Sequence, residues 1–236
     1  MTSSAGLRRF VSGPPPAAQA GAAPSQPPDP ERSPSGDQRA PETEKCELCS
    51  AEIPAEHGHL ADLDHASLLC SCRACYLLFT QHDAVRGRFR AVPDRYLTDP
   101  DRPLTGAEWD ELEIPVGLAF FLRSSREGMV SAFYPSPAGA TECRLDLAAW
   151  DRLTAAHGLL AAAEPDVEAV LITRSGAGSP AAATESFVVP IDACYELAGR
   201  MRLHWRGFDG GSEARQAIAE FLDHVRSRAV PVDQES

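Results

Sequence analysis

Lysine is almost absent from this 236-residue chain. Lys45 is the only lysine, and the other side chains of fixed positive charge are arginines. Lysine and arginine together number 22 against 34 acidic residues, so the formal net charge is -12. A protein that binds nucleic acid needs a basic face to release counterions from phosphates, and an anionic membrane surface attracts basic clusters. The charge balance therefore argues against both kinds of partner.

Long apolar runs are missing as well. No apolar stretch reaches the roughly 18 residues that a membrane-spanning helix needs. The opening residues, MTSSAGLRRFVSGPPPAAQAGAAP, carry two arginines with no continuous apolar stretch behind them, so we expect no secretory signal. We therefore expect a cytoplasmic protein without a membrane span, in a compartment where thiols stay reduced and clustered cysteines bind metal.

The motifs of common enzyme classes are also missing. The segment GAGSPAA lacks the lysine of a phosphate-binding loop, and the chain holds no GxSxG nucleophile motif. Ser136 lies between two prolines and is typical of a turn, while Cys143 and Cys194 stand alone and are interpreted as buried apolar thiols. The sequence demonstrates no enzyme chemistry, and we expect a binding protein.

Composition divides the chain into three parts. Residues 1–43 are rich in proline, alanine, glycine and serine, and such a segment cannot bury enough apolar surface to offset its ordering entropy. We expect it to be a disordered tail. We expect a cysteine-rich metal-binding module at 44–80 and an α+β domain at 81–230, because that last part mixes apolar runs with amphipathic segments.

The module carries five of the seven cysteines, spaced Cys46-x2-Cys49 and Cys70-x-Cys72-x2-Cys75. Two C-x2-C pairs about twenty residues apart are typical of a tetrahedral four-thiolate site, as in zinc ribbons and rubredoxin-like folds. Each turn directs two thiolates at one ion, and the loop between the turns allows the second pair to complete the tetrahedron. The predicted ligands are Cys46, Cys49, Cys72 and Cys75.

Four further side chains are alternates for metal binding. Cys70 would replace Cys72 only by lengthening the second turn, so we interpret it as a buried thiol on a strand or as a neighbour of the ligands. His57, His59 and His65 lie between the two pairs and are interpreted first as polar loop residues. The alternatives are that one of them is a ligand, or that the three form a second, weaker site.

Zinc and mononuclear iron both accept four thiolates, and the spacing does not separate them. Rubredoxin-like iron sites usually carry glycine soon after each turn, where Ser50 and Tyr76 stand in this chain. This favours structural zinc, with iron as the alternative. An iron–sulfur cluster is a lesser option, since it too is held by four thiolates.

The α+β domain is predicted to hold one antiparallel or mixed sheet covered by helices. A strand is expected at 87–92, a hairpin at 116–137 with REG at its turn, and a continuing strand from 138. Two further strands are expected at 167–175 and 185–191, with an amphipathic helix at 147–163 before them. Predicted helix starts are a capping box of Thr105 with Glu108, and N-caps at Asp192 and Ser212.

One polar cluster outside the module is a candidate for partner binding. It consists of His204, Trp205, Arg206 and Asp209 in RLHWRGFDGG, at the end of the helix that starts near Asp192. The alternative is an ordinary helix end with a cationic residue and a glycine stop.

Several segments together resemble an uncharacterised bacterial family, a domain of unknown function often encoded beside nickel–iron hydrogenase structural and maturation genes. These segments are CELC…LLCSCRACYLLF, VPDRYL, IPVGLAFF, AFYPSPAGATE, VPIDACYEL and HWRGFDGG, and the resemblance spans about residues 45–226. It implies an association with an uptake-type hydrogenase in maturation, assembly or electron transfer. The four predicted ligands match the family's cysteine motif, with Cys70 beside them.

We therefore expect a zinc-binding accessory protein that assists hydrogenase assembly or maturation by binding a hydrogenase subunit or maturation factor. Two alternatives remain open at this point. One is a rubredoxin-like electron carrier that uses iron, and the other is a permanent structural subunit of the hydrogenase complex.

Overall fold

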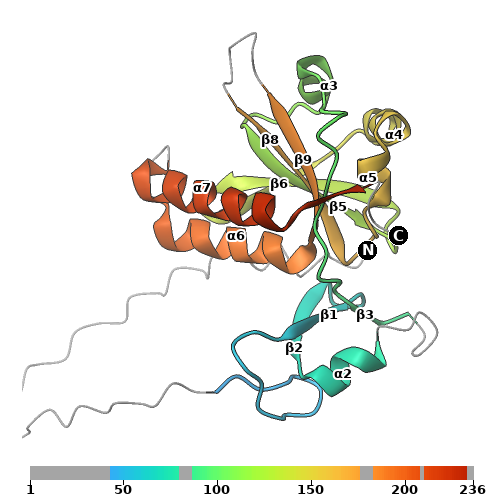
Figure 1. Ribbon diagram of the computed structural model, residues 1–236, viewed down its shortest axis with the longest axis vertical. Helices are drawn as coiled ribbons and strands as arrows, with labels where there is room; N and C mark the ends of the chain where they lie inside the picture. Colours follow the sequence, from blue (N-terminus) through green and yellow to red (C-terminus); the bar gives the residue numbers. More distant parts are fainter. Residues whose placement is uncertain (1–42, 80–86, 176–182, 208–209, 233–236) are drawn as a thin grey trace, which may run out of the picture.

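The computed structural model describes residues 43–79, 87–175, 183–207 and 210–232. Nearly all of the expected N-terminal tail lies outside the described residues. Within them, every helix is too short or too polar to cross a membrane. The described residues form two sheets of different size, and the small sheet lies below the large one in Figure 1. Each sheet has its own helix or helices.

The small sheet belongs to the cysteine-rich part of the chain and has the strand order β2-β1-β3. Its strands are β1 (Gly58–Asp62), β2 (Ser67–Ser71) and β3 (Phe89–Ala91). All pairings are antiparallel, and the short helix α2 (Arg73–Leu78) follows β2. Because β3 pairs with β1, this sheet extends beyond residue 80, where the sequence analysis ended the module.

The large sheet has seven strands in the order β10-β4-β9-β8-β5-β6-β7. All its pairings are antiparallel except that of β10 with β4, so it is mixed. The predicted hairpin is confirmed by the pairing of β5 with β6. The strands are β4 (Leu97–Thr98), β5 (Leu118–Ser124), β6 (Met129–Ser136), β7 (Gly139–Arg144), β8 (Glu168–Arg174), β9 (Thr184–Pro190) and β10 (Val230–Pro231).

Helices cover both faces of the large sheet, which makes three layers (Figure 1). Successive residues of a strand point to opposite faces, so Leu171 packs with one helical layer and Ile172 with the other. The first layer is α6 (Ile191–His204) and α7 (Gly211–Arg228). The second layer is α3 (Gly106–Glu111), α4 (Leu147–Ala156) and α5 (Gly158–Ala162).

The predicted helix starts have different outcomes. The capping box is confirmed, because the Thr105 side chain accepts from the Glu108 amide while the Glu108 carboxylate accepts from the Thr105 amide. The N-cap at Asp192 is wrong: the N-cap of α6 is Pro190, two residues earlier, and the Asp192 carboxylate accepts from His59 instead. The N-cap at Ser212 is also wrong, since Gly210, in left-handed backbone, is the N-cap and α7 begins at Gly211.

The helix predicted over 147–163 is two helices that break at His157. His157 has extended backbone, and its Nε2 lies 3.0 Å from Oε1 of Glu108 in α3. The break turns α5 toward the sheet, where Leu159 and Leu160 are buried. The apolar spacing of the sequence did not reveal this break, because α4 and α5 present apolar residues to the same core cluster.

Polar contacts attach the small sheet to the large one. Arg90 of β3 donates to the carboxylate of Glu164 at 2.7 Å and to the carbonyl of Pro165 at 2.7 Å. Arg126, at the β5–β6 turn, forms an ion pair with Asp64. The His59–Asp192 bond adds a contact with the first turn of α6, so three separate parts of the large domain hold the module.

One buried ion pair yields a stability prediction. The Glu168 side chain is fully buried and accepts from Arg95 Nε at 2.7 Å and Nη2 at 2.9 Å. Replacing Arg95 by Met leaves a buried charge without its partner, so we expect the free energy of unfolding to fall by about 3–5 kcal/mol. Urea denaturation measures it. The matched control is Arg152→Met, whose exposed pair with Glu111 contributes about 0–1 kcal/mol. Equal losses in both variants would contradict the assignment.

Candidate metal centre

Four cysteines from two separate turns converge on one point of the module. The sulfurs of Cys46, Cys49, Cys72 and Cys75 all lie within 4.8 Å of one another. Cys46 is buried, Cys49 is exposed, and the other two are half-buried. A group of this kind can bind a metal ion.

The first turn is a short hairpin. An isolated bridge pairs Lys45 with Glu52, and the Cys46 amide donates to the Ala51 carbonyl at 2.8 Å. Inside it, the Ser50 amide donates to the Cys46 carbonyl at 2.7 Å. These bonds bend the chain so that Cys46 and Cys49 face the same side.

The second turn is the start of helix α2. Cys72 is its N-cap, and its sulfur accepts from the Cys75 amide at 3.4 Å. A C-x2-C pair at a helix start places the two sulfurs one turn apart on the same side. Hairpin geometry in the first turn and helix capping in the second thus each place two sulfurs on the same side of the chain.

Backbone bonds through Cys70 hold the two turns together. The Glu47 amide donates to the Cys70 carbonyl at 2.9 Å, and the Cys70 amide donates to the Glu47 carboxylate at 2.7 Å. Glu47 lies between Cys46 and Cys49, and Cys70 lies two residues before Cys72. The predicted role of Cys70 as a neighbour of the ligands agrees with this position, although its thiol is only half-buried.

The spacing of the sulfurs fits a tetrahedral site. The Cys49 and Cys72 sulfurs are 3.7 Å apart. A tetrahedron with zinc–sulfur bonds of about 2.3 Å has edges of about 3.8 Å. Iron in four-thiolate sites has similar geometry, so the residues fit either ion.

The thiols differ in their electrostatic surroundings. Burial raises the pKa of Cys46, but the amides of Cys72, Cys49 and Leu48 outweigh it and lower the pKa to about 6. The amide of Cys75 lowers the pKa of Cys72. Burial, with hydrogen bonds to the other three thiols, raises the pKa of Cys75 to about 12. Thiolates are the metal-binding form, so an ion entering this site displaces the protons that the thiols still carry.

The lack of glycine after the two turns does not favour zinc over iron. Ser50 has a φ of 61°, so it adopts the left-handed backbone that glycine usually supplies after such a turn. Tyr76 lies inside α2, where helical backbone requires no glycine. The first turn therefore has its left-handed residue without glycine, and the identity of the metal stays open.

Of the alternate ligands, two histidines lie close to Cys70 and the third histidine does not. His57 and His59 lie with Cys70, and their candidate ligand atoms are within 4.8 Å of one another. His65 lies elsewhere, with its Nδ1 2.8 Å from the Asp62 carboxylate. The group of three histidines proposed from the sequence is thus replaced by two histidines and one cysteine.

The two isolated cysteines lie in the large domain. Cys194 of α6 is buried in the core, and burial raises its pKa well above the usual value. Cys143 lies on β7 and is half-buried. Burial of an apolar thiol was the prediction for both, and it holds fully for Cys194 only.

The candidate partner-binding cluster lies at the end of α6. His204 is the last helical residue and is exposed, while the half-buried Trp205 donates through Nε1 to the Gly207 carbonyl at 3.0 Å. Arg206 donates to the carbonyls of Leu203 and Trp205 at 3.0 Å each. Asp209 lies outside the described residues. These local bonds match the ordinary helix-end interpretation, and partner binding stays a prediction.

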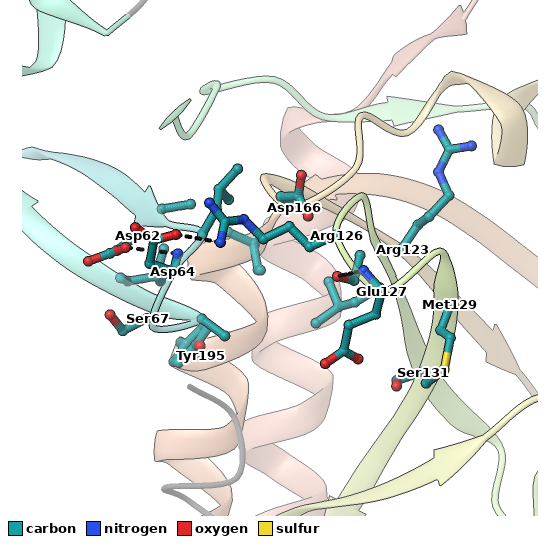
Figure 2. A pocket seen from close by; sticks show the side chains of 17 residues that line it. Asp62, Asp64, Ser67, Arg123, Arg126, Glu127, Met129, Ser131, Asp166 and Tyr195 are labelled. Atoms are coloured by element: carbon teal, nitrogen blue, oxygen red, sulfur yellow. Dashed lines mark hydrogen bonds and ion pairs between the residues drawn. The ribbon is translucent and has the colours of Figure 1, made fainter. Parts of the chain in front are cut away.

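A hollow of about 440 Å³ separates the β1–β2 hairpin from the β5–β6 hairpin. Figure 2 shows Arg126 reaching across it to Asp64, with Asp62 beside them. Burial raises the pKa of Asp62, but hydrogen bonds from Arg88 and His65 outweigh this and hold that pKa well below its usual range. These charged groups pair across and beside the hollow, so we interpret it as an interface between the two parts of the protein.

Sequence reasoning missed Asp192 as the partner of His59. The two residues are 133 positions apart, and the carboxylate oxygen Oδ2 lies 2.8 Å from Nδ1 of the imidazole. No local pattern connects them. The sequence did carry a signal for the pairing of His59 with Cys70. The hairpin 58–71 has a short turn, and this turn sets His59 opposite Cys70.

A protein-family model described as "Family of unknown function (DUF5947)" matches residues 45–229. The chain belongs to this family. No curated protein and no solved structure matches it. Membership confirms that the resemblance was to an uncharacterised family, while the association with hydrogenase genes stays a prediction. Function must therefore be argued from the site.

The four-cysteine centre yields a direct prediction. Cys75→Ser removes one thiolate from the tetrahedron, and we expect the chain to lose one equivalent of tightly bound metal. Metal analysis of the purified full chain, with thermal unfolding of the module followed by circular dichroism, measures this loss. The control is Cys143→Ser, which removes a thiol of the large domain and keeps the metal. Unchanged metal content in Cys75→Ser would contradict the predicted ligand set.

Proposed function

We propose that this protein is a metal-binding accessory factor that acts by binding another protein. The observation that supports this best is the convergence of four cysteine sulfurs on one point. All four positions of a tetrahedral ion would then be filled by protein ligands, which is the arrangement of structural rather than catalytic zinc. Zinc is the proposed ion, with iron as the alternative that four thiolates also accept, and the proposed role of the ion is to hold the module in shape.

Exposed apolar side chains beside the centre support the binding role. Leu48 lies inside the first turn and is 37% exposed, while Leu77 and Leu78 follow the second turn at 48% and 62%. Contiguous exposed apolar patches are typical of protein–protein contact sites, and all three leucines lie within three residues of a predicted metal ligand. We therefore propose that the metal-bearing end of the module contacts the partner.

The partner we propose is a nickel–iron hydrogenase subunit or one of its maturation factors. This part of the proposal rests on the resemblance described from the sequence and on no feature of the fold. The acidic net charge of -12 favours a partner with a basic surface, because complementary charge speeds association.

An electron carrier with iron is the second candidate, and the exposure of Cys49 favours it. A thiolate ligand at the surface shortens the path along which an electron would leave the centre. A visible thiolate-to-iron absorption that bleaches on reduction would establish this role. A colourless, zinc-loaded chain from iron-rich growth would exclude it.

The binding role is tested by capture. We expect the tagged full chain to co-purify hydrogenase subunits from cells that make them, and a deletion strain to contain less mature hydrogenase. Leu78→Asp should reduce capture about tenfold or more, as for a central apolar contact, without changing the metal content. Leu147→Asp, at an exposed apolar residue of α4, is the matched control. Normal levels of mature hydrogenase in the deletion strain would contradict the hydrogenase assignment.

A further inference from the structure

We propose that His57, His59 and Cys70 form a second metal site, for a zinc-class transition-metal ion, on the face of the small sheet that meets helix α6. The ligand atoms of these three side chains lie within 4.8 Å of one another. The site shares no ligand with the four-cysteine centre. It does not depend on which partner the protein binds.

The backbone of the β1–β2 hairpin brings the three side chains together. His57 and His59 are two residues apart, and their ring centroids lie 4.8 Å from each other, so both side chains lie on the same side. Gly58 faces the other side, where a β-carbon would come within 2.6 Å of the Tyr76 ring. Cys70 pairs directly with His59 across the ladder, and opposite residues share a face. The HGH motif therefore brings two imidazoles together, with their planes tilted by 60° and with the residue that packs on α2 between them.

Hydrogen bonds fix the tautomer of each ring. Nδ1 of His57 donates to the carbonyl oxygen of Pro54 at 2.9 Å, and Nδ1 of His59 donates to the carboxylate of Asp192 at 2.8 Å. Both acceptors are oxygens that cannot donate, so both Nδ1 atoms carry the proton. The lone pair of each neutral ring is then on Nε2, which is a common metal-binding atom of histidine.

His57 supplies an independent observation. Its side chain is only 7% exposed, and Nε2 is buried without a hydrogen-bond partner among the described residues. Buried polar atoms in native proteins almost always have a partner. Because Nδ1 already donates to the Pro54 carbonyl, the remaining lone pair on Nε2 is available to a metal cation.

Asp192 completes the arrangement from the large domain. Histidines that bind metal usually donate their second ring nitrogen to a carboxylate or carbonyl, which orients the ring and raises its basicity. Both histidines follow this pattern, with Pro54 and Asp192 as acceptors. Since Asp192 lies in the first turn of α6, an ion on His59 would also strengthen the attachment of the module to the large domain.

The donor set determines the class of ion. Two imidazole nitrogens and one thiolate suit zinc and copper and disfavour magnesium or calcium, which take oxygen ligands. Three protein ligands leave one position of a tetrahedron for water or for a donor atom from outside. The second site is therefore open, in contrast to the closed four-cysteine centre.

Metal titration of the full chain tests the proposal. We expect the wild type, saturated with zinc and then dialysed, to hold two ions per chain, and His57→Ala to hold one. The control is His65→Ala, which changes the third histidine of the same segment and should keep two. Cobalt in place of zinc reports the ligands directly, because the second equivalent should show weaker thiolate charge-transfer absorption than the first.

Two results would overturn the proposal. One is a wild-type chain that saturates at a single ion with four-thiolate absorption only. The other is His57→Ala that keeps two ions. An unchanged first-equivalent cobalt spectrum in His57→Ala shows that the variant is folded, and the wild-type titration decides the question without any variant.

Asp192→Asn tests the positioning role of the carboxylate. We expect the affinity for the second ion to fall by about 10–100-fold, the usual effect of losing such a partner, while the affinity for the first ion is unchanged. Glu196→Gln is the control on the same helix, since Glu196 pairs with Arg200 instead. Equal second-ion affinity in Asp192→Asn and the wild type would remove Asp192 from the site.

Discussion

The convergence of four thiols is the constraint on which the small module depends. Between residues 43 and 79 the described apolar side chains that are fully buried are few, namely Cys46, Ile53, Leu60 and Ala61. A segment of that length cannot fold on apolar burial alone and generally needs a metal, a disulfide or a partner. No disulfide joins the cysteines of the described residues, so we propose that an ion at the four sulfurs is the cross-link that joins the two turns.

The geometry of the rest of the module is consistent with the proposed cross-link. The mutual bonds of Glu47 and Cys70 align the first turn with β2, and this alignment sets the sulfurs of both turns at tetrahedral spacing. The β1–β2 ladder then divides its side chains between two faces. One face packs on α2 through Gly58 and Tyr76, and the other carries His57, His59 and Cys70 toward α6. The proposed second metal site and the docking to the large domain thus share one small hairpin.

Much of this architecture was predictable because the signals are local. Two C-x2-C pairs predicted the centre, the REG turn predicted the β5–β6 hairpin, and Thr105 with Glu108 predicted a capping box; each involves residues that are close in sequence. The failures involve long-range contacts. Asp192 appeared to be a cap because its partner His59 is 133 residues away, and the break at His157 depends on Glu108 of another helix.

In the candidate site, too, local sequence signals were predictable and features of the folded backbone were not. The spacing identified the four cysteines but not the left-handed backbone of Ser50, which removes the reason for preferring zinc over iron. Grouping His57 and His59 with Cys70 required the strand register, which is set by the turn between β1 and β2. Even with the register known, the identity of the ion depends on chemistry that zinc and iron share at four thiolates.

Amide hydrogen exchange before and after metal removal tests the central claim most directly. The account predicts that chelation abolishes the protection of the β1 and β2 amides, while those of β5, β8 and β9 in the large sheet stay protected. Restoring the metal should restore the protection. If β1 and β2 keep full protection in the demonstrably metal-free chain, the module does not depend on an ion and the account is wrong.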